Sequence, residues 1–141
     1  MKIPYRFYYN SYTVMAAATG EALTHIPALD GYQEGDRLTL AHESEIEVAN
    51  DTGDVQICEV LFFVFNDLWS RPDEYRGPSM SVGDVVTLIG IKHFACAQMG
   101  FTTVDISKSK LLPAPPEWTR TNKELETYKL RKRAEMERNI A

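Results

Sequence analysis

The side chains that could support nucleophilic catalysis lie in the second half of the chain. Ser79, Ser81 and Cys96 offer hydroxyl or thiol nucleophiles, and His93 and Asp84 offer a base and a group to orient it. In a strand, however, His93 and Cys96 would lie on opposite faces because their separation is odd. The chain also lacks a Gly-x-Ser-x-Gly elbow. We therefore assign no catalytic residue and keep a small hydrolase, using Cys96 or Ser79/Ser81 with His93, as an alternative.

Metal-ligating residue types occur at two places, without the spacing of a known metal motif. His42 is followed by Glu43 and Glu45, and His25 is followed by Asp30. Strand alternation would separate His42 from the two glutamates, and the chain has no HExxH or Cys-His pattern. The sequence therefore predicts no metal site and no cofactor. Cys58 and Cys96 are expected to be reduced and packed rather than paired.

The charge of the chain is acidic and uneven. Its 141 residues carry a formal net charge of −5 at pH 7, which argues against direct nucleic-acid binding. The alternation over 38–48 predicts one strand, or two strands joined by a bend, with an acidic outer face, and turn residues follow it. One face would hold Leu38, Leu40, His42, Ser44, Ile46 and Val48, and the other Thr39, Ala41, Glu43, Glu45 and Glu47.

The acidic face suggests one specific function. Carboxylates spaced along an extended strand can imitate a row of phosphates and be steered by charge to a basic groove. An acidic nucleic-acid mimic that inhibits a host nucleic-acid-binding defence enzyme is therefore an alternative function.

Turn and periodicity signals divide the rest of the chain into elements. Aromatic and β-branched residues over 3–17 favour a strand leading into a hairpin, with a return strand near 22–26. Helical spacing over 55–69 predicts a helix that is apolar nearly all round and therefore buried, and a central strand is the competing interpretation because β-branched and aromatic residues are frequent there. The Gly-Asp pairs at 35–36 and 83–84 are interpreted as turns that start strands, since glycine permits unusual backbone angles and aspartate bonds nearby amides.

The last third of the chain favours a meander, a linker and a helix. Strands are expected at 84–89, 92–97 and 101–106, around a turn at Gly90. The prolines of 113–118 predict an extended linker, and residues 119–141 predict a polar helix with a capping box from Thr121 to Glu124. The expected fold is α+β, with one domain over 1–112. In it, small antiparallel sheets pack on one hydrophobic helix, and a C-terminal polar helix follows a Pro-rich linker.

A family resemblance covers residues 59–106. A hydrophobic helix ends in Phe65-Asn66, a Pro-containing loop follows, and a hairpin ends in Gly100-Phe101. Between them stand Tyr75, Arg76, Gly77, Ser79, Met80, Ser81, Val82, Gly83 and Asp84. This arrangement resembles the YodL-like family, small domains of bacteria and their mobile elements. The resemblance implies an α+β domain with no established catalytic role or cofactor that travels among accessory genes of phages and plasmids.

The leading functional hypothesis is a non-enzymatic accessory protein, phage- or plasmid-borne, that binds and modulates a host protein. The chain has neither a signal-peptide pattern nor a membrane-length apolar run, so we expect a cytoplasmic protein without a membrane partner. Its partner would be a host protein or another copy of itself. The expected contact residues are Glu43, Glu45, Glu47, Asp51 and Asp54 on the acidic side, and Leu125, Tyr128 and Met136 along the last helix.

Overall fold

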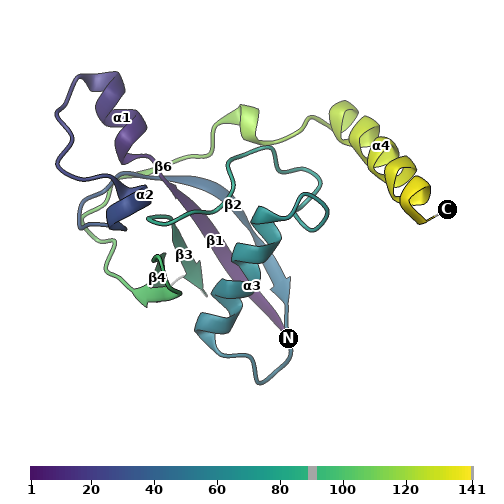
Figure 1. The fold of residues 1–141 in the computed structure, drawn as a ribbon, viewed down its shortest axis with the longest axis horizontal. Coiled ribbons are helices and arrows are strands. Elements are labelled where there is room, and N and C mark those ends of the chain that lie inside the picture. Colours follow the sequence, from purple (N-terminus) through teal and green to yellow (C-terminus); the bar gives the residue numbers. More distant parts are fainter. Residues whose placement is uncertain (89–91, 141) are drawn as a thin grey trace.

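The computed structural model describes residues 1–88 and 92–140, and within these ranges the chain forms one mixed sheet and four α-helices (Figure 1). The strands are ordered β5-β4-β3-β1-β2-β6. They are β1 (Lys2–Asn10), β2 (Leu38–Glu47), β3 (Val85–Leu88), β4 (Lys92–Cys96), β5 (Phe101–Thr103) and β6 (Leu111–Leu112). The helices are α1 (Tyr12–Thr19), α2 (Pro27–Asp30), α3 (Asp54–Asn66) and α4 (Asn122–Ile140). The α+β prediction is confirmed.

The sheet is larger than expected and is not purely antiparallel. β1 lies in its middle and pairs antiparallel with both β2 and β3, although these strands are far apart in the sequence. β6 pairs parallel to β2 at its first two residues, which makes the sheet mixed. The expected small antiparallel sheet on one helix is therefore correct only in its antiparallel centre and in the packing of α3 on one face (Figure 1).

The predicted N-terminal hairpin is wrong. The first strand ends at Asn10, α1 follows at once, and residues 22–26 form no strand. Met15 is followed by three alanines, and this run of strong helix formers outweighs the β-branched residues that precede it. Gly20 then ends the helix in the left-handed conformation, with φ of 76°.

A β-bulge changes the face assignment predicted for β2. Phe7 opposes His42 and Tyr8 opposes Leu40, so Ala41 is an extra residue. Before the bulge, Leu40 packs with Tyr8 on the face away from α3, whereas Ala41 belongs to the core under α3. The predicted face assignment is therefore wrong before the bulge, because Leu38 and Leu40 lie on the opposite face of the sheet from Ile46 and Val48.

α3 forms as predicted but is not buried on all sides. Ile57, Cys58, Leu61 and Phe65 face the sheet and are buried, whereas Phe63 on the outer side is 61% exposed. The helix lies on the outside of the sheet, so its second apolar side has no covering layer among the described residues (Figure 1). The helical period of the apolar residues predicted the helix correctly, but it does not indicate whether a second layer of the protein covers the outer side of that helix.

The last third of the chain follows the predicted order. β3 and β4 are present, the expected turn at Gly90 lies outside the described residues, and β5 ends at Thr103. Residues 116–118 form a short 3₁₀-helix (η1, Pro116–Trp118), and Trp118 packs edge-on against Tyr9 with ring centroids 5.7 Å apart. Among the described residues, no helix is long and apolar enough to cross a bilayer.

The capping box of α4 forms as the sequence predicts. The N–H of Thr121 donates to Glu124, and the N–H of Glu124 donates to the Thr121 hydroxyl. α4 has no buried residue and extends away from the sheet (Figure 1). It contacts the domain through the loop that follows α3.

Candidate functional site

Asn10, the last residue of β1, joins the two Gly-Asp turns of the chain. Its side-chain amide donates to Asp36 Oδ2 at 3.0 Å and to the Gly83 carbonyl at 2.9 Å. Its side-chain oxygen accepts from the N–H of Tyr12, and its backbone N–H donates to Asp84 Oδ1 at 2.8 Å. Every polar group of this buried side chain is used, so Asn10 fixes the two turns relative to each other.

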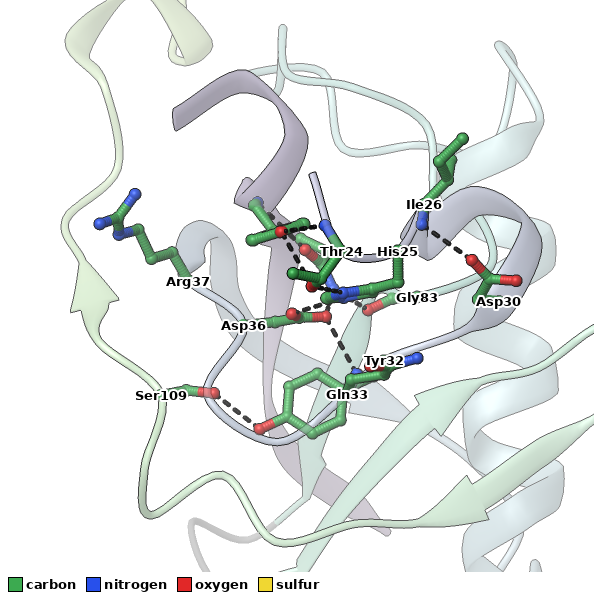
Figure 2. A network of polar contacts seen from close by, with 12 residues as sticks. Thr24, His25, Ile26, Asp30, Tyr32, Gln33, Asp36, Arg37, Gly83 and Ser109 are labelled. Atoms are coloured by element: carbon green, nitrogen blue, oxygen red, sulfur yellow. Dashed lines mark hydrogen bonds and ion pairs between the residues drawn. The ribbon is translucent and has the colours of Figure 1, made fainter. Parts of the chain in front are cut away.

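Asp36 is the centre of the first turn (Figure 2). Its Oδ2 also accepts from the N–H of Gln33 at 3.0 Å, and its Oδ1 lies 2.7 Å from His25 Nε2. Both side chains of this contact are buried. The Nε2 nitrogen faces the carboxylate off the hydrogen-bond axis and has no other partner among the described residues. The Asp36 carboxylate therefore accepts hydrogen bonds from Asn10 and Gln33 and lies against the imidazole of His25.

His25 connects this carboxylate to a hydroxyl. Thr24 Oγ1 lies 3.0 Å from His25 Nδ1 (Figure 2). The imidazole ring stacks on Tyr12 at a centroid distance of 4.4 Å. A hydroxyl that contacts an imidazole, which in turn contacts a carboxylate, has the groups of a base-activated nucleophile. Here, Tyr12 Oη is also 3.1 Å from the Thr24 hydroxyl, so that hydroxyl is part of a longer hydrogen-bonded chain. The arrangement closes the loop after α1 onto β1.

Asp84 is the centre of the second turn. Its carboxylate accepts from the N–H groups of Asn10 and Ser81 and is almost completely buried. Burial raises the pKa of Asp84 to about 7, against the lowering effect of the two amide donors. Gly83 precedes it with φ of 95°, and a Cβ there would come within 2.8 Å of Pro27. Only glycine allows this approach without strain.

Several residues that carry the resemblance to the YodL-like family form hydrogen bonds within the segment between α3 and β3. Asn66 donates to the carbonyls of Phe62 and Met80, and the hydroxyl of buried Tyr75 donates to the Pro78 carbonyl at 2.6 Å. The remaining motif residues lie in three groups. Phe65 and Met80 are buried in the core. Gly77, Val82, Gly83 and Asp84 form turns. Arg76, Ser79, Ser81, Gly100 and Phe101 are more exposed.

The predicted nucleophile set is only partly brought together: Asp84 accepts hydrogen bonds from the N–H groups of Ser81 and Cys96, but His93 is separated from Cys96. Phe94 packs under α3 and Ala95 on the other face, so His93 and Cys96 lie on opposite faces of β4, as predicted from their spacing. His93 Nδ1 is 2.8 Å from the Thr87 hydroxyl, and burial raises the pKa of the Cys96 thiol to about 11. This thiol is therefore protonated and enclosed, which disfavours nucleophilic attack.

The residue types considered for metal binding are separated too. His42 uses one nitrogen for Tyr5 Oη, at 2.9 Å, and the other for Glu74, at 3.1 Å. Glu43 and Glu45 are on β2 beyond it, exposed to solvent. Within residues 1–88 and 92–140, no group of three or more His, Cys, Asp or Glu side chains is placed to hold a metal ion.

The acidic side of β2 adjoins an open edge of the sheet. β6 pairs only with Leu38 and Thr39, and Pro113 follows it, so the parallel pairing ends there. No other described segment pairs its backbone with the far half of β2. A strand edge of this kind presents unpaired N–H and C=O groups to any extended chain that approaches.

The pairing with β1 determines which groups of β2 point into this edge. The N–H of Val48 donates to the Met1 carbonyl at 2.9 Å, which makes this pair a hydrogen-bonded one. Successive residue pairs in an antiparallel ladder alternate between hydrogen-bonded pairs and non-hydrogen-bonded pairs. The glutamates at 43, 45 and 47 all lie an odd number of residues from Val48, so they belong to non-hydrogen-bonded pairs with β1. Their N–H and C=O groups therefore point away from β1, into the open edge.

The side chains of these glutamates are accessible and partly paired. Glu43 is 3.1 Å from Arg6 and Glu47 is 3.3 Å from the N-terminal amine, yet the two side chains remain 55% and 68% exposed. Beside them is a shallow cavity of about 430 Å³, lined by Pro4, Tyr5, Arg6, Glu43, Ser44, Glu45 and Thr87. Of the other predicted acidic contacts, Asp51 lies in an exposed turn and Asp54 pairs with Lys92 at 2.8 Å.

The predicted stripe on the last helix is partly used inside the protein. The ring of Tyr128 lies under the Arg120 guanidinium at 3.7 Å, whereas Met136 is exposed and Leu125 is half-buried. Lys132, one turn after Tyr128, bonds Asp73 at 2.8 Å. α4 therefore docks on its own domain at its middle.

Comparisons with protein-family models, curated proteins and solved structures give no match to this chain. The class of protein is therefore defined by its own geometry, as an α+β domain with one helix on a mixed sheet and an acidic, open strand edge.

Proposed function

We propose that this protein is a non-enzymatic accessory domain that binds an extended, basic segment of another protein along the open edge of β2. The observation that supports this most directly is the outward direction of the backbone groups of Glu43, Glu45 and Glu47. An extended segment that pairs with them would add a strand to the sheet, a common mode of peptide recognition.

The side chains of the edge supply specificity. In an added strand, alternate side chains lie beside the three glutamates on the face away from α3. Lysine or arginine there would form cross-strand pairs with carboxylates, each worth about 0.2–1 kcal/mol. Three such pairs contribute about 2 kcal/mol, or about thirtyfold in Kd. The cavity beside Glu43 could take one longer side chain.

The same charges disfavour self-association at this edge. Two copies of β2 paired edge to edge would set glutamates against glutamates, and like charges in opposed positions are destabilising. The partner would therefore be a different protein. A host protein bound by an accessory protein of a mobile element is consistent with the resemblance to the YodL-like family, which we retain as part of this proposal.

A matched pair of variants tests the proposal. Glu45→Gln removes one charge, whereas Glu45→Pro also removes the outward N–H without breaking a bond to β1. Binding is measured by fluorescence anisotropy against extended peptides with Lys or Arg at alternate positions, and against shuffled peptides of equal charge. We expect the proline variant to bind at least tenfold more weakly than the glutamine variant. Equal binding by these two variants would exclude strand addition.

The acidic mimic remains a second candidate, because three exposed carboxylates do follow one another along β2. A mimic uses charge alone. If it is correct, Gln at positions 43, 45 and 47 abolishes partner binding, and Glu45→Pro has no effect beyond that of Glu45→Gln. A variant with Gln at Glu126, Glu135 and Glu137 on α4 is the control for total charge.

A further inference from the structure

We propose that the cleft between the loop after α3 and α4 is a binding site for a nucleoside phosphate. The cleft has a volume of about 350 Å³. Its cationic lining residues are Arg71, Arg76, Arg120, Arg131 and Lys132, and Trp69 stands on its wall. It lies apart from the edge of β2, and the inference does not depend on the function proposed there.

Two of the arginines are held in place before any ligand arrives. Arg120 donates from Nη1 to the carbonyls of Asp73 and Tyr75, at 2.8 and 2.9 Å, while its plane covers Tyr128. Arg71 donates from Nη2 to the Phe65 carbonyl at 3.1 Å and lies over a second tyrosine ring. A guanidinium that is already fixed loses little entropy when it binds an anion.

Two of the lining residues carry donors that have no acceptor among the described residues. The Nε atom of Arg71 is buried and has no hydrogen-bond partner among the described residues. Arg131 is exposed on α4 and forms no ion pair with a described residue. Arg131 is therefore available to a ligand oxygen in the cleft, whereas the Nε of Arg71 is covered by protein atoms and leaves only the charge of its guanidinium to the site.

The balance of charge in the cleft is positive, although the whole chain is acidic. Five cations line it, and three carboxylates lie at or beside it: Asp73 pairs with Lys132, Glu124 pairs with Arg76, and Glu135 is in the wall. The sum is +2, in a protein of net charge −5. Phosphate carries close to two negative charges at neutral pH and matches the fork geometry of arginine.

The remaining wall favours an organic phosphate over the inorganic ion. Trp69 is 44% exposed and Leu68 is 70% exposed, so accessible apolar surface, including an indole ring, adjoins the cations. Nucleobases stack on such aromatic surfaces, with about 1–3 kcal/mol per base in known cases. The volume of the cleft is within the range of small-molecule sites and larger than phosphate alone requires. A nucleoside phosphate satisfies both the charged and the aromatic sides.

The test is isothermal titration calorimetry of the full chain with 5′-AMP, 5′-CMP, adenosine and inorganic phosphate. We expect at least one of the two nucleotides to bind at least tenfold more tightly than adenosine and than phosphate. Trp69→Ala should reduce nucleotide affinity to that of phosphate and leave phosphate binding unchanged. Phosphate or adenosine binding as tightly as both nucleotides, or no binding of either nucleotide, would overturn the inference.

A charge variant and an oligonucleotide complete the experiment. Arg131→Gln should weaken nucleotide binding by about tenfold, whereas Arg138→Gln, the same change farther along α4 and outside the cleft, should alter it by less than twofold. Equal effects of the two variants would refute the site. A 5′-phosphorylated oligothymidine that binds tenfold more tightly than the nucleotides would identify the ligand as the end of a strand, and weaker binding would identify it as a free nucleotide. An unphosphorylated oligonucleotide that binds as well as the phosphorylated one would contradict the proposal.

Discussion

Replacing Asn10 by aspartate should be among the most damaging single-atom changes in this chain. The substitution keeps the shape and the acceptor for the Tyr12 N–H, but it removes the amide that donates to Asp36 at 3.0 Å and to Gly83 at 2.9 Å. Two carboxylate oxygens then face each other about 3 Å apart in a buried place. The carbonyl of Gly83 loses a donor at the same time.

The magnitude follows from two contributions. An acceptor left unsatisfied in the interior costs about 1–3 kcal/mol. Two full charges 3 Å apart repel by about 5 kcal/mol at an effective dielectric constant of 20, and the pair limits this cost by taking up a proton. We therefore expect Asn10→Asp to lose about 4–6 kcal/mol at pH 8. The loss should fall to about 2–3 kcal/mol near pH 5, where one proton is shared between the carboxylates.

Urea unfolding followed by tryptophan fluorescence at pH 5 and pH 8 measures this difference. With a slope of about 2 kcal/mol per molar urea, the midpoint at pH 8 should fall by about 2–3 M. Asn139→Asp, the same chemical change at an exposed position of α4, should shift it very little. If Asn10→Asp lies within 0.5 kcal/mol of the original protein at pH 8, Asn10 does not join the two turns as described.

Three further predictions concern the same core. Burial raises the pKa of Asp84 from 3.8 to about 7, so the folded state holds a proton that the unfolded state releases. The free energy of unfolding should therefore fall by up to about 4 kcal/mol between pH 4 and pH 7. Asp84→Asn should flatten this pH dependence when it is measured by urea unfolding. Burial also raises the pKa of Cys58 to about 12 and that of Cys96 to about 11. Both thiols of the folded protein should therefore react with Ellman's reagent at pH 8 at least a hundredfold more slowly than those of the protein unfolded in urea. Fast reaction of the folded protein would refute the burial of these thiols. In thermal unfolding, Gly83→Ala should destabilise the protein by more than about 2 kcal/mol. Gly20 also has a positive φ but has open space for a Cβ, so Gly20→Ala should destabilise the protein by about 1 kcal/mol. Equal losses would argue against the close approach of Gly83 to Pro27.

Local patterns were sufficient for the elements whose signals do not depend on distant contacts. The helical period of α3, the β-branched run that contains Val86 and the capping box at Thr121 are each contained in a few adjacent residues. The same is true of the opposite faces of His93 and Cys96, which follow from the geometry of a strand. These predictions are confirmed because backbone geometry alone fixes them.

Local patterns failed where neighbouring strands decide the outcome. The bulge at Ala41 reverses the alternation of β2, so that Leu38 and Leu40 pack on the face away from α3 and Ile46 packs under α3. The turn from β1 into α1 depends on Asn10, whose partners lie 26 and 73 residues away in the sequence. No window of neighbouring residues contains these relations.

The sequence by itself determined that Gly35-Asp36 and Gly83-Asp84 are turns, since glycine permits positive φ and aspartate accepts from nearby amides. It also determined that β2 carries an acidic row. Only the tertiary structure decided that the two turns meet at Asn10, because β1 lies between the strands that the turns precede. It also decided that the acidic row borders an open edge, because β6 ends before Pro113 and leaves the rest of β2 unpaired among the described residues.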